Sequence, residues 1–126
     1  MIIDYFPGKM FQTEKDGVCS VEPVHILGAA AAANTLIIAA VTGKRILVLG
    51  GVLRARTVQS DVAFFSAAAG TQIHTYTVPA VGSATPNVDI LPQSWGAFVT
   101  LTSQGLYANF GAGDVDVSLM YITYTP

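Results

Sequence analysis

Short β-rich runs, each bounded by glycine, proline or another turn residue, make up most of the chain from residue 35 onward. In one of them Val58, Ser60, Val62 and Phe64 alternate with more polar neighbours, the period of two expected of a strand with one face toward a core. Further runs span 36–41, 45–54, 72–78, 97–102, 106–110 and 115–124, which gives about seven strands. The alanine-rich tracts are short and flanked by glycine, so helix is not favoured. The sequence predicts an all-β, antiparallel β-sandwich.

The run 45–54 is apolar on both faces. Ile46, Leu47, Val48 and Leu49 follow one another, and Val52 and Leu53 come soon after. An antiparallel strand without a solvent side must be covered twice, and in a chain of 126 residues we expect another copy to supply the second cover. Ile46, Val48 and Val52 are therefore predicted to lie at an oligomer interface. The turn residues 42–44 predict that 36–41 and 45–54 form a hairpin.

Composition limits the surroundings of such a fold. Apolar residues make up 52% of the chain and charged residues only 11%, against about 25% in typical soluble proteins. The surplus of apolar surface favours a subunit interface or a larger assembly. The most apolar stretch, 26–41, is short for a membrane span and is interrupted by Asn34 and Thr35, so we expect no membrane association. The net charge of -2 also gives no electrostatic footprint for nucleic acid.

The amino-terminal part differs from the rest of the chain. Six charged residues precede Pro23, and the apolar side chains Tyr5, Phe6, Met10 and Phe11 lie around a Pro-Gly turn signal without a clean period. We interpret residues 1–33 as an extended arm and linker and residues 34–126 as the sandwich domain. The four apolar side chains are predicted to contact a larger assembly, and the domain is expected to fold without residues 1–22. The equally weighted alternative is that they fold back over the domain's own core.

No constellation in the sequence predicts chemistry. His25 and His74 have no carboxylate or cysteine at ligand spacing, and Cys19 is the only cysteine. Asp114 and Asp116 follow a glycine turn but lack the further ligands of a calcium loop. The prediction is a non-enzymatic protein with no catalytic residue, metal or cofactor.

Two aromatic residues could serve as a platform for a ligand such as a sugar. Trp95 lies in a Pro-Gln-Ser-Trp-Gly segment, and Tyr107 lies in a later β-rich run. For Trp95, packing against the core or an interface is the favoured interpretation, because large aromatic side chains more often serve that purpose.

Residues 34–49, with the sequence NTLIIAAVTGKRILVL, resemble the opening of a group of bacteriophage virion β-sandwich proteins. The segment around Pro92 and Trp95 and the aromatic strand 117–124 occupy later places in the same pattern, so the resemblance covers residues 34–126. It implies a jelly-roll-like module of capsid decoration proteins, head fibres or tail appendages, commonly a homo-oligomer, with a trimer as the expected number.

The resemblance implies a structural function. The expected role is a capsid decoration or cement protein that binds the phage major capsid protein on the virion surface and stabilises the head, after synthesis in the host cytoplasm. The alternative is a tail or head-fibre module that binds a host glycan or receptor.

Overall fold

The computed structural model describes residues 10–14, 17–30, 33–83, 87–90 and 97–126, with the strands at residues 10–20 described by their backbone. Every regular element in these ranges is a β-strand, and no helix in them is long and apolar enough to cross a membrane. The strands are β1 (Met10–Glu14), β2 (Gly17–Ser20), β3 (Glu22–Gly28), β4 (Thr35–Ile38), β5 (Arg45–Ala55), β6 (Ser60–Ser66), β7 (Thr71–Val78), β8 (Asn87–Ile90), β9 (Phe98–Val99), β10 (Leu106–Phe110) and β11 (Val115–Tyr124).

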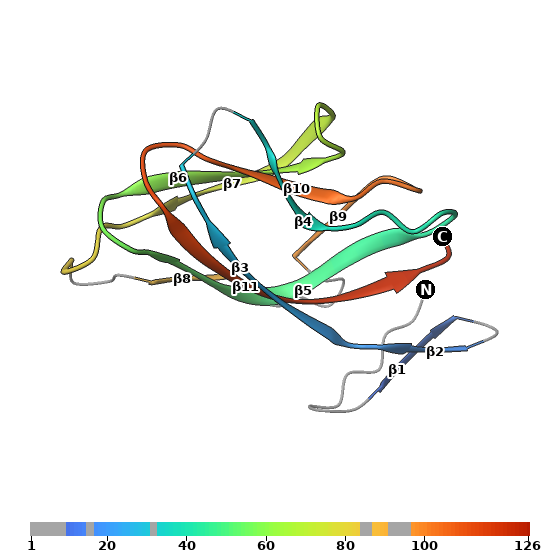
Figure 1. Ribbon diagram of the computed structural model, residues 1–126. Coiled ribbons are helices and arrows are strands. Elements are labelled where there is room, and N and C mark those ends of the chain that lie inside the picture. Colours follow the sequence, from blue (N-terminus) through green and yellow to red (C-terminus); the bar gives the residue numbers. More distant parts are fainter. Residues whose placement is uncertain (1–9, 15–16, 31–32, 84–86, 91–96) are drawn as a thin grey trace.

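Two antiparallel sheets face each other across the core (Figure 1). One is four-stranded with the order β4-β10-β6-β7, and the other is five-stranded with the order β3-β11-β5-β8, where β9 also pairs with β5. β1 and β2 pair only with each other as a separate two-stranded sheet. The predicted all-β antiparallel sandwich is confirmed.

The strand order is that of a jelly roll. From β3 to β11, the first strand pairs with the last, β4 pairs with β10, β5 pairs with β8 and β9, and β6 pairs with β7. The chain is therefore a series of antiparallel strand pairs wrapped around one core. The pairs β3–β11 and β5–β8 lie in the five-stranded sheet, and the pairs β4–β10 and β6–β7 lie in the four-stranded sheet.

The core forms between the sheets because each long strand alternates inward apolar side chains with outward ones. In β6 the inward side chains of Ser60, Val62 and Phe64 are all buried, as the period of two predicts. Phe64 packs against Phe98 of β9 with ring centroids 4.9 Å apart, which joins the two sheets. Val58, predicted on the same face, instead lies before β6 and is exposed.

The predicted hairpin at residues 42–44 is wrong. β4 and β5 lie in different sheets, where β4 pairs with β10 and β5 with β11. The turn itself exists: the Lys44 N–H donates to the Val41 carbonyl at 3.0 Å, and Gly43 takes a φ of 77° that favours glycine. A tight turn at the end of a sandwich can cross between sheets as well as reverse within one.

The sandwich begins earlier than residue 34. Residues 22–28, which the sequence interpretation places in the arm and linker, form β3 and pair along their length with β11. Val24 and Ile26 of this strand pack against the core. The boundary of the domain therefore moves to Glu22, and only β1, β2 and the residues around them precede it.

Candidate functional site

The five-stranded sheet has a surface that faces away from the core, which we call the outer face. Alternation along the strands fixes its members, because their neighbours Val24, Ile26, Leu53, Val117 and Leu119 pack inward. It comprises Pro23, His25, Leu27, Gly50, Val52, Arg54, Asn87, Asp89, Asp116, Ser118 and Met120.

Apolar side chains are exposed on the outer face. Leu27 is 62% exposed, Met120 42% and Val52 39%, high values for large apolar side chains that share one sheet. Beside Val52 and Met120 lies a shallow depression of about 470 Å³, lined chiefly by apolar groups of β3, β5 and β11. Gly51 lines it on β5, and a Cβ at Gly51 would collide with the Ser118 carbonyl. Close approach of two backbones thus explains the glycine and the hollow together.

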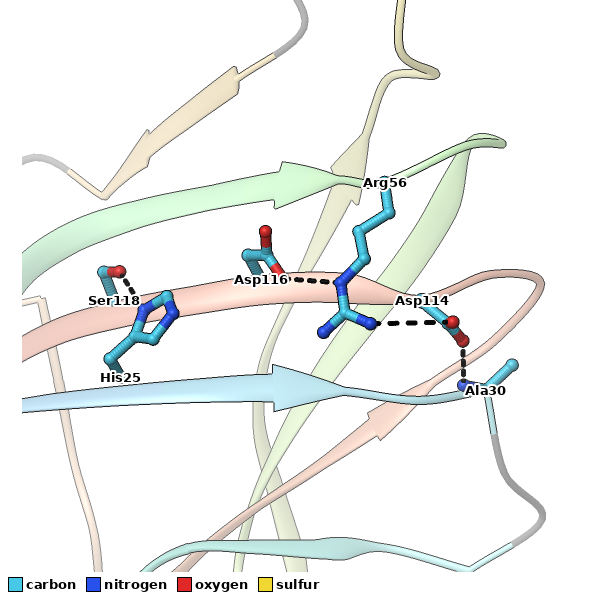
Figure 2. A network of polar contacts seen from close by, with 6 residues as sticks. All are labelled: His25, Ala30, Arg56, Asp114, Asp116 and Ser118. Carbon is cyan, nitrogen blue, oxygen red and sulfur yellow. Dashed lines mark hydrogen bonds and ion pairs between the residues drawn. The ribbon is translucent and has the colours of Figure 1, made fainter.

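A polar network closes one end of the outer face (Figure 2). Arg56, just after β5, donates from Nε to Asp116 Oδ1 at 2.7 Å and approaches Asp114 Oδ2 at 3.8 Å. Asp114 also accepts a hydrogen bond from the Ala30 N–H at 3.0 Å. The network ties the ends of β3 and β5 to the start of β11. The two carboxylates thus anchor strand ends, which agrees with the interpretation of this segment as a turn leading into a strand.

His25 and Ser118 form a hydrogen bond of 2.8 Å between Nδ1 and Oγ on the same face. A nucleophilic serine needs a base that is itself oriented by a third group. The carboxylate of Asp116, next along the outer side of β11, is engaged by Arg56 instead. The pair therefore lies on an open strand surface as a link between β3 and β11. His74 contacts other rings, with centroids 4.5 Å from Tyr76 and 6.4 Å from Phe98.

The structure divides the three residues predicted for an oligomer interface. Ile46 and Val48 are buried in the core between the sheets, so their side chains offer no surface to a second copy. Val52 lies on the outer face and is exposed. The described residues bring no group of three or more histidine, cysteine or acidic side chains together as a metal site.

Both faces of β5 are buried at its start, as the sequence predicts, but the second cover belongs to the same chain. Leu47, Leu49 and Ile122 form a second cluster on the outer side of the sheet. Val21, Val99 and Tyr124 pack against it, and β2 runs close to β11 there. The expectation that another copy covers this part of β5 is therefore corrected: the segment before β3 contributes to the cover.

The remaining predicted residues are placed unequally. Tyr5, Phe6 and Trp95 lie outside the described residues. Met10 and Phe11 belong to β1, where the description covers the backbone alone. Tyr107 lies on β10 on the outside of the four-stranded sheet, paired with Leu36 on one side and Phe65 on the other.

Sequence reasoning missed Leu27 and Met120. The outward position of Met120 could have been predicted, since Met120 follows Asp116 and Ser118 at a spacing of two and so lies on the same side of the strand. Leu27 had no such signal, because its strand was interpreted as a linker.

Comparison with known proteins identifies no family for this chain. No protein-family model matches the chain, and no curated protein matches it. A solved structure from work described as "Bacillus endospore appendages form a novel family of disulfide-linked pili" aligns with 20% sequence identity and a TM-score of 0.47, covering 90% of this chain and 96% of that chain. A similarity of this size does not carry a function from one protein to the other.

Proposed function

We propose that this chain is a non-enzymatic structural subunit that works by packing against other protein chains. The observation that carries the proposal is the outer face of a chain with only 11% charged residues. Val52 and Met120 expose apolar surface beside a depression there, and Leu27 is exposed on the same face. Several large apolar side chains exposed on one face of a folded domain indicate a place where another molecule binds. A sheet face presents them on a rigid support.

The more specific role that we propose is a capsid decoration or cement protein on the surface of a phage head, with the major capsid protein as partner. The resemblance of residues 34–126 to phage virion sandwich proteins supports this assignment. A cement protein stabilises a shell through the area that it buries and needs no active site, so an adhesive jelly roll is sufficient. We also propose that the subunit forms a homo-oligomer, for which the resemblance implies a trimer.

Immunogold electron microscopy tests this role. An antiserum against the purified chain is applied to particles released from cells that produce it, and gold on the heads is the expected result. Particles stripped of the chain should also lose heads on heating sooner than complete particles. Gold on tails would favour the alternative role, and a chain found only in the particle-free supernatant would contradict both.

A tail or head-fibre module that binds a host glycan is the second candidate. The row of Leu36, Tyr107 and Phe65 across the four-stranded sheet supports it, because aromatic side chains on a flat sheet can stack on sugar rings. A glycan array distinguishes the candidates: glycan binding that is lost in Tyr107→Ala supports the module, and an array without binding supports the cement protein.

A further inference from the structure

The outer face consists of three rows of residues that cross its strands at fixed register. The central row is His25, Ser118, Val52 and Asp89, in the order β3, β11, β5, β8. The row toward the polar network is Leu27, Asp116, Arg54 and Asn87, and the row on the other side is Pro23, Met120 and Gly50. Beyond this last row the second cluster is covered by the chain itself, so these three rows form the open part of the face.

Opposite charges stand side by side in one of these rows, and a histidine and a carboxylate stand at the two edges of another. Asp116 on β11 neighbours Arg54 on β5, and His25 on β3 lies at the opposite edge from Asp89 on β8. Among the described residues, neither Arg54 nor Asp89 takes part in a salt bridge within the chain. A surface with charges of both signs at equal distances from a central line can pair with a copy of itself.

We infer that the outer face binds the outer face of a second copy of this chain about a two-fold axis that runs parallel to the strands, between β11 and β5. This inference rests on the proposed role as an assembling subunit and names its partner. About this axis β11 lies over the second copy's β5, and β3 lies over its β8. Each row then meets the same row of the second copy.

The register selects this axis. Asp116 of each copy faces Arg54 of the other, and His25 faces Asp89. A two-fold axis across the strands would instead place Asp116 over Met120 and Arg54 over Gly50, which buries both charges against apolar groups at high cost. The face pairs its charges in only one of these two arrangements.

Shape agrees with charge at the third row. Met120 projects from the face, and its neighbour across the register is Gly50, which has no side chain. With β11 over β5, Met120 of each copy meets the bare backbone of Gly50 in the other, beside the depression that Gly51 lines. Methionine suits this contact because its unbranched side chain adapts to irregular gaps. Ser118 meets Val52 between these contacts.

The contact is expected to be weak in isolation. Four strands spaced about 4.8 Å apart and five residues at about 3.4 Å each give roughly 320 Å² of flat sheet. Stable complexes bury about 800 Å² on each partner, so we expect a dissociation constant in the micromolar range or weaker. An assembly that holds many copies close together would strengthen it through effective concentration.

Charge reversal with rescue tests the inference. Sedimentation is measured up to about 1 mM for the unchanged chain, for Arg54→Glu and for Asp116→Lys, with a melting curve for each to confirm folding. We expect the unchanged chain to dimerise and each variant alone to bind itself at least about tenfold more weakly, because like charges meet. An equimolar mixture of the two variants should recover association, because Glu at 54 then meets Lys at 116 and Arg54 meets Asp116.

Thr75→Glu, on the outside of the four-stranded sheet, is the matched control and should leave association unchanged. The inference is overturned by a chain that stays monomeric at about 1 mM, by an oligomer that the two charge reversals leave unchanged, or by folded variants whose mixture gains nothing. A monomer that nonetheless labels phage heads would refute this contact and leave the proposed function standing. A dimer that the mixture restores, in a chain that is absent from phage particles, would support this contact and refute the proposed function.

Discussion

Substitution of Gly28 by alanine tests whether β3 belongs to the sandwich. Gly28 is the last residue of β3 and faces inward, where the ring of Phe110 from the opposite sheet packs onto it. Three ring carbons lie within 2.6 Å of the place where a Cβ would stand. Phe110 is itself only 1% exposed, so its ring has little room to retreat. If residues 22–28 were a linker, the added methyl group would meet nothing.

Two effects of opposite sign compete in Gly28→Ala. Loss of glycine from the unfolded chain stabilises the folded state by about 0.4–1 kcal/mol. Forcing a methyl group into a packed core destabilises by about 1–3 kcal/mol. The second effect wins, and the net loss of about 1–2 kcal/mol lowers the melting temperature by about 4–8 °C for a chain of this length.

Thermal unfolding followed by circular dichroism measures the effect. Gly111→Ala is the matched control, because the nearest atom to its built Cβ is the Asp61 carbonyl oxygen at 3.5 Å, an ordinary contact. In a Phe110→Leu background the further loss from Gly28→Ala should shrink, since the smaller side chain leaves room. A Gly28→Ala variant as stable as Gly111→Ala would refute the packing of β3 onto the core.

Three further outcomes are expected. Arg56→Ala should lower the free energy of unfolding, measured by chemical denaturation, by about 1 kcal/mol, since it removes the 2.7 Å hydrogen bond to Asp116. Arg56→Lys should restore only part of this free energy. No loss in Arg56→Ala would mean that the polar network does not stabilise the fold. Deletion of residues 1–22 should lower the melting temperature, contrary to the sequence prediction, because it removes Val21 from the second cluster. Val21→Ala alone should lower the free energy of unfolding by about 1 kcal/mol. An unchanged melting temperature for both variants would show that Val21 does not cover the cluster. Burial raises the pKa of Tyr76, and burial, followed by the charge of Glu22, raises the pKa of Tyr121. The folded state should therefore keep its stability below the ordinary tyrosine pKa of 10.0 and lose stability as the pH rises above that value. Melting temperatures measured over a pH series check this, and their fall should be smaller in Tyr121→Phe.

Strands with strict alternation could be predicted to the residue. The ranges 106–110 and 115–124 coincide with β10 and β11, because in β10 and in the first half of β11 the inward positions are apolar and the outward ones mostly polar. The segment 97–102 failed in length, and only Phe98 and Val99 form a strand. β3 was missed because Pro23, Gly28 and the alanines that follow are typical of a linker, while the partner that makes it a strand, β11, lies about 90 residues further along the chain.

The candidate site shows the same limit in another form. The two-sided apolar strand correctly indicated that β5 needs two covers, but sequence alone could not say which residues share a side, because Leu49 is an extra residue opposite the Met120–Tyr121 step of β11. The residues that cover the outer side of β5 also come from distant parts of the sequence. Val21 and Tyr124 pack against the second cluster at the start of β5, whereas the outer face beyond it stays open. The exposed apolar side chains are thus confined to the open half, where Leu27, Val52 and Met120 come from three different strands. A surface of that kind exists only after the strands have paired, so no single segment of the sequence encodes it.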